Sequence, residues 1–566
     1  MIKTKQKAMK LFKKSIFLLA ISATALTSCI DEVTPTTVAT QDMVEHSLSA
    51  QEAMLYGIPS AMIATDDSRH YQFGYSSIMH IRDLMTGDMA KDQASQYDQY
   101  WAWEQNAYMG RDYVFPSYIW SYYYDLINTS NNVISSVNPE DATEEQLGVL
   151  GAGLAYRALA YLDLAQMFEV KPNDILPETA PGFIPSANNA ANNIYGLTVP
   201  IITENTTEEE SHNTPRATKE EMFQFIETDL LKAVEYIPGL SLTDKTFPHL
   251  DCVYGLLARL YMWHGDYDKA YEAAVNAISN ASVAPISEDQ GLSTTNGFNT
   301  ASDFMWAGQF SKENRAVTSG IINWTSMVSN ETTYGYAGGG DVWVMIDASL
   351  YHKISDTDWR KLMWKAPEGT ALDGKTPYIR QSWSSYIPTY GSVKFRPGQG
   401  EMSDYSIASS VAFPVMRVEE MYFIAAEAAA RIQGPAAGLS ILTDFMQSYR
   451  DDSYSSEASS LDDVIEEIIL QKRIELWGEG ISFFDIKRLN MPVTRGYSGS
   501  NFDAMYQYNS NGTFPGWMNM VVPRNEENNN PATSEFRTPD PSDKYTPWGM
   551  GEETRAMTSH RVLKLK

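Results

Sequence analysis

The chain has 566 residues, of which 43% are hydrophobic, 20% are charged and 12% are aromatic. This composition is typical of a globular protein, and it excludes a chain that is disordered, collagen-like or coiled-coil throughout. The formal net charge of −28 argues against nucleic acid and anionic lipid surfaces as partners, because both are bound by basic surfaces.

The first 28 residues have the layout of a secretory signal peptide, with a lysine-rich start and a short apolar stretch at 16–26. That stretch is shorter than the ~20 apolar residues that span a bilayer. Leu26-Thr27-Ser28-Cys29 resembles a bacterial lipobox, in which the cysteine becomes the lipidated first residue. We therefore expect residues 1–28 to be removed and Cys29 to begin a lipidated tether over 29–45. An ordinary signal peptide with a chance cysteine is the alternative.

Asp31 and Glu32 lie just after this cysteine. Acidic residues at this place resemble the signals that export some Gram-negative lipoproteins to the cell surface. We expect a protein of the outer membrane that faces the cell exterior and reaches the membrane through its lipid anchor only. The one other cysteine is Cys252, so no disulfide is expected.

Helices are predicted in much of the remaining chain. Thr143 with Gln146, Thr218 with Glu221, and Ser460 with Asp463 have the spacing of capping boxes, and each precedes apolar residues at helical intervals. Between the helical groups lie stretches rich in Asn, Ser, Thr, Gly and Pro. They are too long for simple connections and predict functional loops or small subdomains: 171–216, 281–340, 366–410 and 491–550.

Residues 251–280 have the spacing of a tetratricopeptide unit, a pair of antiparallel helices. The small side chains of Ala258, Ala270 and Ala277 would let the two helices approach closely, and Gly265-Asp266 would form the turn. Weaker pairs are predicted around 421–446 and from 120–137 with 143–168. Such pairs act as binding scaffolds.

Several motifs resemble those of SusD/RagB-type lipoproteins, and they occur in that family's order. The strongest is Lys472-Arg473-Ile474-Glu475-Leu476-Trp477-Gly478-Glu479-Gly480, continued by Phe484-Asp485-Ile486-Lys487-Arg488. Lys472 departs from the expected Glu, and Ile481-Ser482 replaces an expected Arg. The other matching segments are 120–131, 155–164, 257–261, 417–428 and 522–526.

The resemblance implies a mainly α fold, in which tetratricopeptide-like helix pairs form a scaffold with a loop-rich remainder packed on it. One SusD-like domain is expected over 46–566, with its helical half roughly at 46–280 and 411–490. It also implies a nutrient-binding protein, not an enzyme, that delivers an oligosaccharide or polysaccharide to a SusC-like TonB-dependent transporter and acts as its lid. Some members bind a peptide instead. Arg473, Glu475, Asp485 and Arg488 are expected to form structural ion pairs.

A sugar site needs flat aromatic rings for stacking and polar side chains for the hydroxyl groups. Twelve of the 28 residues at 97–124 are aromatic. Around Trp101 and Trp103 the rings alternate with polar residues without helical periodicity, so they are candidates for ligand contact as much as for the core. Together with Asn106 they resemble the aromatic arc of starch-binding members. Residues 120–124 are assigned to core packing.

A second candidate is the glycine-containing loop 323–343, where a mobile backbone could approach a ligand. Packing of this loop on the surface is the alternative. Its candidate contacts are Asn323, Trp324, Tyr334, Tyr336 and Trp343. Arg82 is a further candidate for hydroxyl bonding, and a solvated or ion-paired side chain is the alternative.

No catalytic motif accompanies these residues. The eight histidines are scattered, and neither a His-Glu-x-x-His sequence nor a Gly-x-Ser-x-Gly elbow occurs. No cofactor is expected, although an acidic loop could hold a structural Ca²⁺. A secreted α-helical glycoside hydrolase or lyase remains the alternative from another class, and a pure interaction scaffold is a third.

Overall fold

The computed structural model describes residues 44–66, 69–91, 109–173, 194–295, 297–507, 509–510, 512–534, 537–538 and 540. Contacts divide the chain into two compact units, Met1–Leu48 and Ser49–Lys566. Cys29 lies outside the described residues. Every contact discussed below lies in the second unit.

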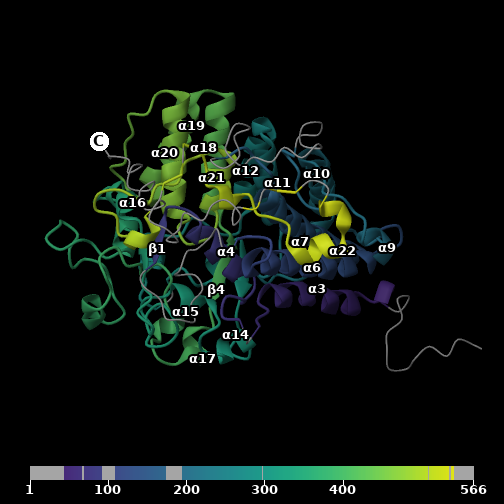
Figure 1. The fold of residues 1–566 in the computed structure, drawn as a ribbon, viewed down its shortest axis with the longest axis horizontal. Coiled ribbons are helices and arrows are strands. Elements are labelled where there is room, and N and C mark those ends of the chain that lie inside the picture. Colours follow the sequence, from purple (N-terminus) through teal and green to yellow (C-terminus); the bar gives the residue numbers. More distant parts are fainter. Residues whose placement is uncertain are drawn as a thin grey trace, which may run out of the picture. The chain divides into compact units, whose positions relative to one another are not determined.

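The fold is mainly helical, as predicted (Figure 1). The longer helices are α3 (Leu48–Met62), α4 (Tyr75–Leu84), α6 (Val114–Ser135), α7 (Glu144–Phe168), α10 (Lys219–Tyr236), α11 (Leu250–His264), α12 (Tyr267–Asn280), α18 (Val418–Ile432), α19 (Pro435–Tyr449) and α20 (Leu461–Glu475). Short helices are α9 (Glu208–Ser211), α13 (Glu288–Gly291), α14 (Arg315–Thr318), α15 (Trp324–Val328), α16 (Ala348–His352), α17 (Tyr405–Ala408), α21 (Ser482–Arg488) and α22 (Arg524–Asn529).

The three predicted capping boxes are confirmed. The Thr143 hydroxyl accepts the backbone N–H of Gln146, whose side chain accepts the N–H of Thr143 in return. Thr218 begins α10 in the same way, and Ser460 begins α20. Each box satisfies two N–H groups that the first helical turn leaves without a partner.

The predicted helix pairs are also confirmed. α6 packs on α7, α11 on α12, and α18 on α19. Gly265 ends α11 with a left-handed backbone (φ 99°), and Ala270 and Ala277 are fully buried in α12. α12 also packs on α18, so helices about 150 residues apart in sequence form one scaffold. The green helices α18, α19 and α20 can be followed together in Figure 1.

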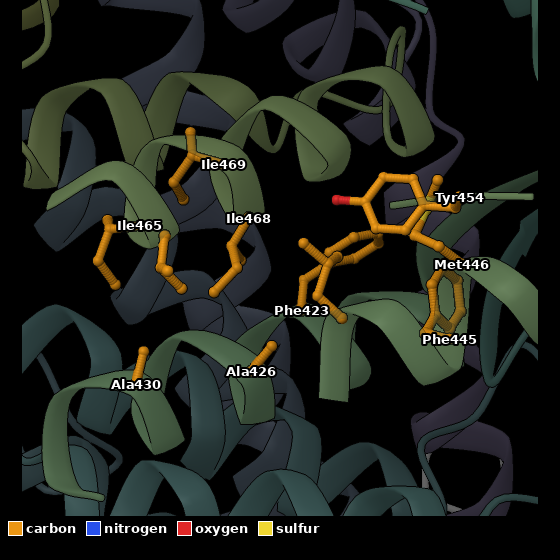
Figure 2. Packing of buried hydrophobic residues seen from close by; sticks show 11 residues of the cluster. Phe423, Ala426, Ala430, Phe445, Met446, Tyr454, Ile465, Ile468 and Ile469 are labelled. Carbon is orange, nitrogen blue, oxygen red and sulfur yellow. The ribbon is translucent and has the colours of Figure 1, made fainter. Parts of the chain in front are cut away.

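Figure 2 shows the core between α18, α19 and α20. Ala426 and Ala430 on α18 are small enough for α19 and α20 to approach closely. The isoleucine side chains of α20 lie on one side of Phe423, and Phe445 lies on its other side next to Met446. Burial of each such side chain contributes ~1.5–3 kcal/mol to stability. The spacing of the apolar residues along α20 therefore decides which face of the helix packs against α18 and α19.

Two short antiparallel ladders tie the loop-rich segments to the scaffold. β1 (Met89–Lys91) pairs with β3 (Val344–Ile346), and β2 (Trp306–Gln309) pairs with β4 (Ala412–Met416). Met89 lies opposite Ile346, and Gln309 lies opposite Ala412. The Asn/Ser/Gly-rich stretch 281–340 therefore contains short ordered elements rather than one long loop.

α7 is the one described helix that is long and apolar enough to cross a membrane. However, 94% of its most apolar window is buried by the rest of the fold. Its apolar character is therefore that of a central core helix, which is surrounded by α6, α10 and α11.

Two glycine substitutions are expected to have opposite effects on stability. A Cβ at Gly148 in α7 would lie 2.1 Å from the backbone nitrogen of Leu240, so Gly148→Ala is expected to cost ~1–3 kcal/mol or more. At Gly57 in α3 the nearest atom would be 3.7 Å away, so Gly57→Ala should add ~0.5–1 kcal/mol through helix propensity. Urea unfolding of both variants checks this, and equal effects at the two positions would contradict it.

Candidate functional site

Arg82 is not a surface residue, contrary to one of the site predictions. Its side chain is fully buried in α4, and its Nη1 lies 2.9 Å from Oδ2 of Asp163 on α7. Its guanidinium also lies over the Phe484 ring, 4.6 Å from the ring centre. All residues of α4 are buried because the helix is enclosed on every side. Arg82 is therefore a structural residue, and the ion-paired alternative holds for it.

The 323–343 segment is packed rather than open. Asn323 is buried and caps α15 by accepting the N–H of Ser326, and Trp324 is fully buried with its ring 5.1 Å from that of Phe395. A Cβ at Gly338 would lie 2.3 Å from the carbonyl oxygen of Thr332. This glycine therefore allows close packing within the segment. The prediction of ligand contact is wrong for Asn323 and Trp324, whose side chains are enclosed.

The other three aromatic residues of this segment are also largely enclosed. The Tyr336 hydroxyl bonds the His70 ring, and Trp343 packs in a small cluster with Tyr378. Tyr334 is the most accessible of the three, and its hydroxyl lies 2.8 Å from the Ser409 hydroxyl. The segment therefore offers one partly exposed ring instead of an aromatic surface.

Trp101, Trp103 and Asn106 lie outside the described residues, so their ligand contact stays a prediction. The segment that carries them joins Lys91, the last residue of β1, to Met109. Arg111, two residues further on, lines the cleft described below.

The residues of the 472–488 signature form ion pairs, as predicted. Glu475 lies 2.7 Å from Arg450 and 3.0 Å from both Arg360 and Arg417. Burial alone would raise the pKa of Glu475, but the guanidinium groups outweigh it and hold the pKa well below its usual range. Arg473 pairs with Asp88.

Lys472, the departure from the family pattern, has a structural role. Its Nζ lies 2.7 Å from Oδ2 of Asp485, and that carboxylate also accepts a hydrogen bond from Arg488 at 2.9 Å. Arg488 pairs in turn with Glu427 at 2.6 Å. Glu427 also pairs with Arg431 at 2.8 Å, so three cations and two carboxylates come together where α20, α21 and α18 meet. These side chains connect the three helices.

The candidate binding site is an open cleft of about 600 Å³ over the first half of α6. This volume is within the ~300–1,000 Å³ that is typical of small-ligand sites. Three parts of the chain form it: residues of the connection between α3 and α4, residues of 111–125, and the segment 523–525. The lining side chains are those of Ala64, Thr65, Asp66, Arg69, Gln72, Arg111, Asp112, Tyr113, Val114, Ser117, Tyr118, Ser121, Tyr122, Asp125, Pro523, Arg524 and Asn525.

The helical repeat places two rows of side chains along the cleft. Ser117, Ser121 and Asp125 follow each other at intervals of four residues, and Tyr118 and Tyr122 form the adjacent row. The Tyr118 hydroxyl is engaged with the backbone of Gly74 at 3.1 Å, which fixes α6 against the start of α4. The floor of the cleft therefore carries both rings and hydroxyl groups.

An ion pair holds the far wall in place. Arg524 binds the Asp112 carboxylate with two nitrogen atoms, one of them at 2.6 Å, and its backbone N–H donates to the carbonyl of Arg111 at 2.9 Å. These hydrogen bonds lower the pKa of Asp112. Residues about 400 positions apart thus form one wall of the cleft.

Sequence reasoning missed this cleft. The run of aromatic residues at 120–124 was assigned to the core, which holds for Trp120 and Tyr123. Tyr122, however, also lines the cleft. The available signal was the four-residue spacing of Ser117, Ser121 and Asp125, a polar stripe on the otherwise apolar and aromatic first half of α6.

The described residues contain no group of three or more His, Cys, Asp or Glu side chains that could hold a metal ion. Cys252 is a buried free thiol.

Two sequence models of one family match the chain. Residues 67–262 match the one described as "Starch-binding associating with outer membrane", and residues 321–547 match the one described as "SusD family". Together the two matches take in most of the sequence. Among curated protein sequences, none matches this chain.

Solved structures share the fold. A SusD-like carbohydrate binding protein from Bacteroides vulgatus ATCC 8482 superimposes with a TM-score of 0.66 at 20% identity, over 87% of this chain and 98% of that one. A SusD superfamily protein from Bacteroides thetaiotaomicron VPI-5482 gives a TM-score of 0.62 at 19% identity, over 87% of this chain and 100% of that one.

Proposed function

The chain belongs to the SusD/RagB family, and on that premise we propose that it captures a glycan at the outer membrane without cleaving it. The captured oligosaccharide or polysaccharide passes to a partner SusC-like TonB-dependent transporter, for which the chain acts as a lid. Cys29 carries the lipid anchor, and the protein faces the cell exterior. The observation that carries the proposal is the match of two family models over two separate parts of the chain.

The helical scaffold supports a binding role. Its buried ion pairs and tightly packed helix pairs make a rigid frame, and the loop-rich segments and the cleft are attached to that frame. A rigid frame lowers the entropy that ligand binding must overcome. Binding of a sugar by stacking and hydroxyl bonds is modest in strength, which suits a ligand that must leave for a transporter.

Trp101, Trp103 and Asn106 are our proposed primary contacts. Two indole rings separated by one residue would stack on the apolar faces of sugar rings, and the Asn106 amide would bond a hydroxyl group. The carboxylates of this acidic chain would disfavour strongly anionic glycans, and this favours a neutral glycan.

Affinity electrophoresis tests the function. A chain that begins at Ile30 is run through gels that contain neutral or acidic polysaccharides, beside a Trp101→Ala, Trp103→Ala double variant. We expect one neutral polysaccharide to retard the chain, and the double variant to bind at least about tenfold more weakly because two stacking rings are lost. Tyr386→Ala is the matched control, because Tyr386 is 64% exposed and its removal leaves the core intact. Trp517→Ala is unsuitable, because Trp517 is buried.

The outcomes separate the candidate functions. Shortening of the polymer during incubation would contradict the proposal and favour the hydrolase or lyase. Absence of retardation by every polysaccharide would also contradict it, and capture of a peptide would then be the function to pursue. If the polysaccharide still retarded the double variant, glycan capture would be supported, but the binding site would lie away from Trp101 and Trp103.

A further inference from the structure

We propose that the cleft over α6 is a binding subsite for uncharged sugar rings of the captured glycan. This inference rests on the proposed function and adds the place and the chemical class of the ligand. It is carried by four features of the cleft: an exposed ring at its edge, a row of hydroxyl groups, a buried phenol hydroxyl without a partner, and the balance of charges in its walls.

Tyr113 supplies the stacking ring. It lies directly before α6, lines the cleft and is 42% exposed, which is unusual for so large an aromatic side chain in this protein. The apolar face of a pyranose ring can cover an exposed aromatic ring while its hydroxyl groups point sideways. Ser117, one helical turn further along α6, offers a hydroxyl group within the same cleft.

Tyr122 supplies the strongest sign of a missing ligand. Tyr122 as a whole is 9% exposed, and its hydroxyl is buried without a hydrogen-bond partner among the described residues. A buried hydroxyl without a partner costs about 1–3 kcal/mol, so such a group is uncommon without a reason. Neighbouring hydroxyls on α6 are engaged: Tyr118 bonds Gly74, and Tyr123 donates to Asp163 at 2.7 Å. Tyr122 lines the cleft, so a shift of its ring toward the cleft would let a sugar hydroxyl become its partner.

The charges of the cleft select against an anionic ring. Each guanidinium that lines it already faces a carboxylate: Arg69 faces Asp66 at 3.9 Å, Arg111 faces Glu527 at 3.8 Å, and Arg524 is bound by Asp112. None of them is therefore left over to pair with a uronate or a sulfate group.

Asp125 adds an acceptor at the end of the hydroxyl row. No described residue gives its carboxylate a hydrogen bond or an ion pair, and partial burial raises its pKa. A carboxylate in this state accepts hydrogen bonds from neutral hydroxyl groups and repels a carboxylate on the ligand. The cleft therefore fits an uncharged, hydroxyl-rich ring.

Two polysaccharides with the same backbone test the inference. The probes are the neutral polysaccharide that retards the chain and the same polymer oxidised at C6 to the uronate. We expect the oxidised polymer to bind at least about tenfold more weakly at 150 mM salt, where long-range repulsion from the acidic surface is screened. We expect Tyr113→Ala to weaken binding of the neutral polymer about tenfold, and Tyr122→Phe about threefold to tenfold.

Matched variants separate binding from folding. Tyr122→Phe removes a hydroxyl without a partner, so the free protein should keep its melting temperature. Tyr123→Phe removes a bonded hydroxyl from the same helix, so it should lower the melting temperature but keep the affinity. Tyr386→Ala, which removes an exposed ring outside the cleft, should change neither.

The outcomes distinguish failure of the subsite from failure of the proposed function. Undiminished affinity of both Tyr113→Ala and Tyr122→Phe, beside a weakened Trp101→Ala, Trp103→Ala variant, would overturn the subsite and leave glycan capture standing. Equal or tighter binding of the oxidised polymer would overturn the assignment to uncharged rings. Absence of binding to any polysaccharide would overturn the proposed function and the subsite together.

Discussion

Glu475→Ala is expected to cost at least ~3–5 kcal/mol of unfolding free energy, the range observed when one partner of a buried ion pair is removed. Glu475 is 1% exposed and binds three guanidinium groups, those of Arg360, Arg417 and Arg450, which are all fully buried. Arg450 would lose most, because it binds both carboxylate oxygens of Glu475 and would keep Glu419 at 3.3 Å, whereas Arg360 would keep Asp358 at 2.6 Å. Chemical unfolding followed by tryptophan fluorescence measures the loss.

Glu466→Ala is the matched control. Glu466 lies on the same helix, α20, but is exposed, so its replacement should change stability by no more than ~0.5 kcal/mol. Glu475→Gln keeps the shape of the side chain but removes its charge. Its free energy of unfolding should fall nearly as much as that of Glu475→Ala. A Glu475→Ala chain as stable as the Glu466→Ala chain would show that the buried ion pairs contribute nothing net.

The pKa of Glu475 gives the same prediction a pH dependence. Since the folded-state pKa is held well below the ordinary value, the carboxylate contributes its full stability above the unfolded-state pKa of about 4.3. That contribution is lost progressively as the pH falls below this value toward the folded-state pKa. The difference in stability between the parent chain and Glu475→Ala should therefore be largest near neutral pH and shrink below about pH 4. A difference that grows on acidification would contradict this assignment.

Asp163→Ala is expected to have the second largest effect, again ~3–5 kcal/mol of lost stability. The Asp163 carboxylate accepts hydrogen bonds from Arg82 at 2.9 Å, Tyr75 at 2.8 Å and Tyr123 at 2.7 Å, and it is 2% exposed. Among the described residues, its removal leaves the buried Arg82 cation without a carboxylate partner, and the Tyr75 and Tyr123 hydroxyls lose their acceptor. Thermal unfolding at neutral pH checks the loss.

Tyr75→Phe is the control for this network, because it removes one hydrogen bond and leaves the ion pair intact. It should cost ~0.5–1.5 kcal/mol, clearly less than Asp163→Ala. The comparison also tests the structural role of Arg82. If Arg82→Met lowered glycan affinity but kept the melting temperature, Arg82 would be a ligand contact and its structural assignment would be wrong.

The limits of sequence reasoning are clearest in the 323–343 segment and in α4. Aromatic rings beside glycines are compatible with an exposed ligand loop and with a tightly packed one. The choice depends on residues far along the chain, such as Phe395 against Trp324 and Thr332 against Gly338. Likewise, a sequence containing Arg82 and Asp83 looks polar, yet α4 is enclosed because it lies against both α21 and β1.

Local patterns in the sequence were sufficient to predict the capping boxes at Thr143, Thr218 and Ser460 and the helix pairs. These features depend on spacings of a few residues, which helix geometry converts directly into faces and contacts. The sequence also indicated that Glu475 forms ion pairs, but its arginine partners lie 25 to 115 residues away and were found in the folded structure, as were the buried rings and the cleft. The cleft brings together the residues 64–72, 111–125 and 523–525, and burial is a property of such distant neighbours, which no local pattern contains.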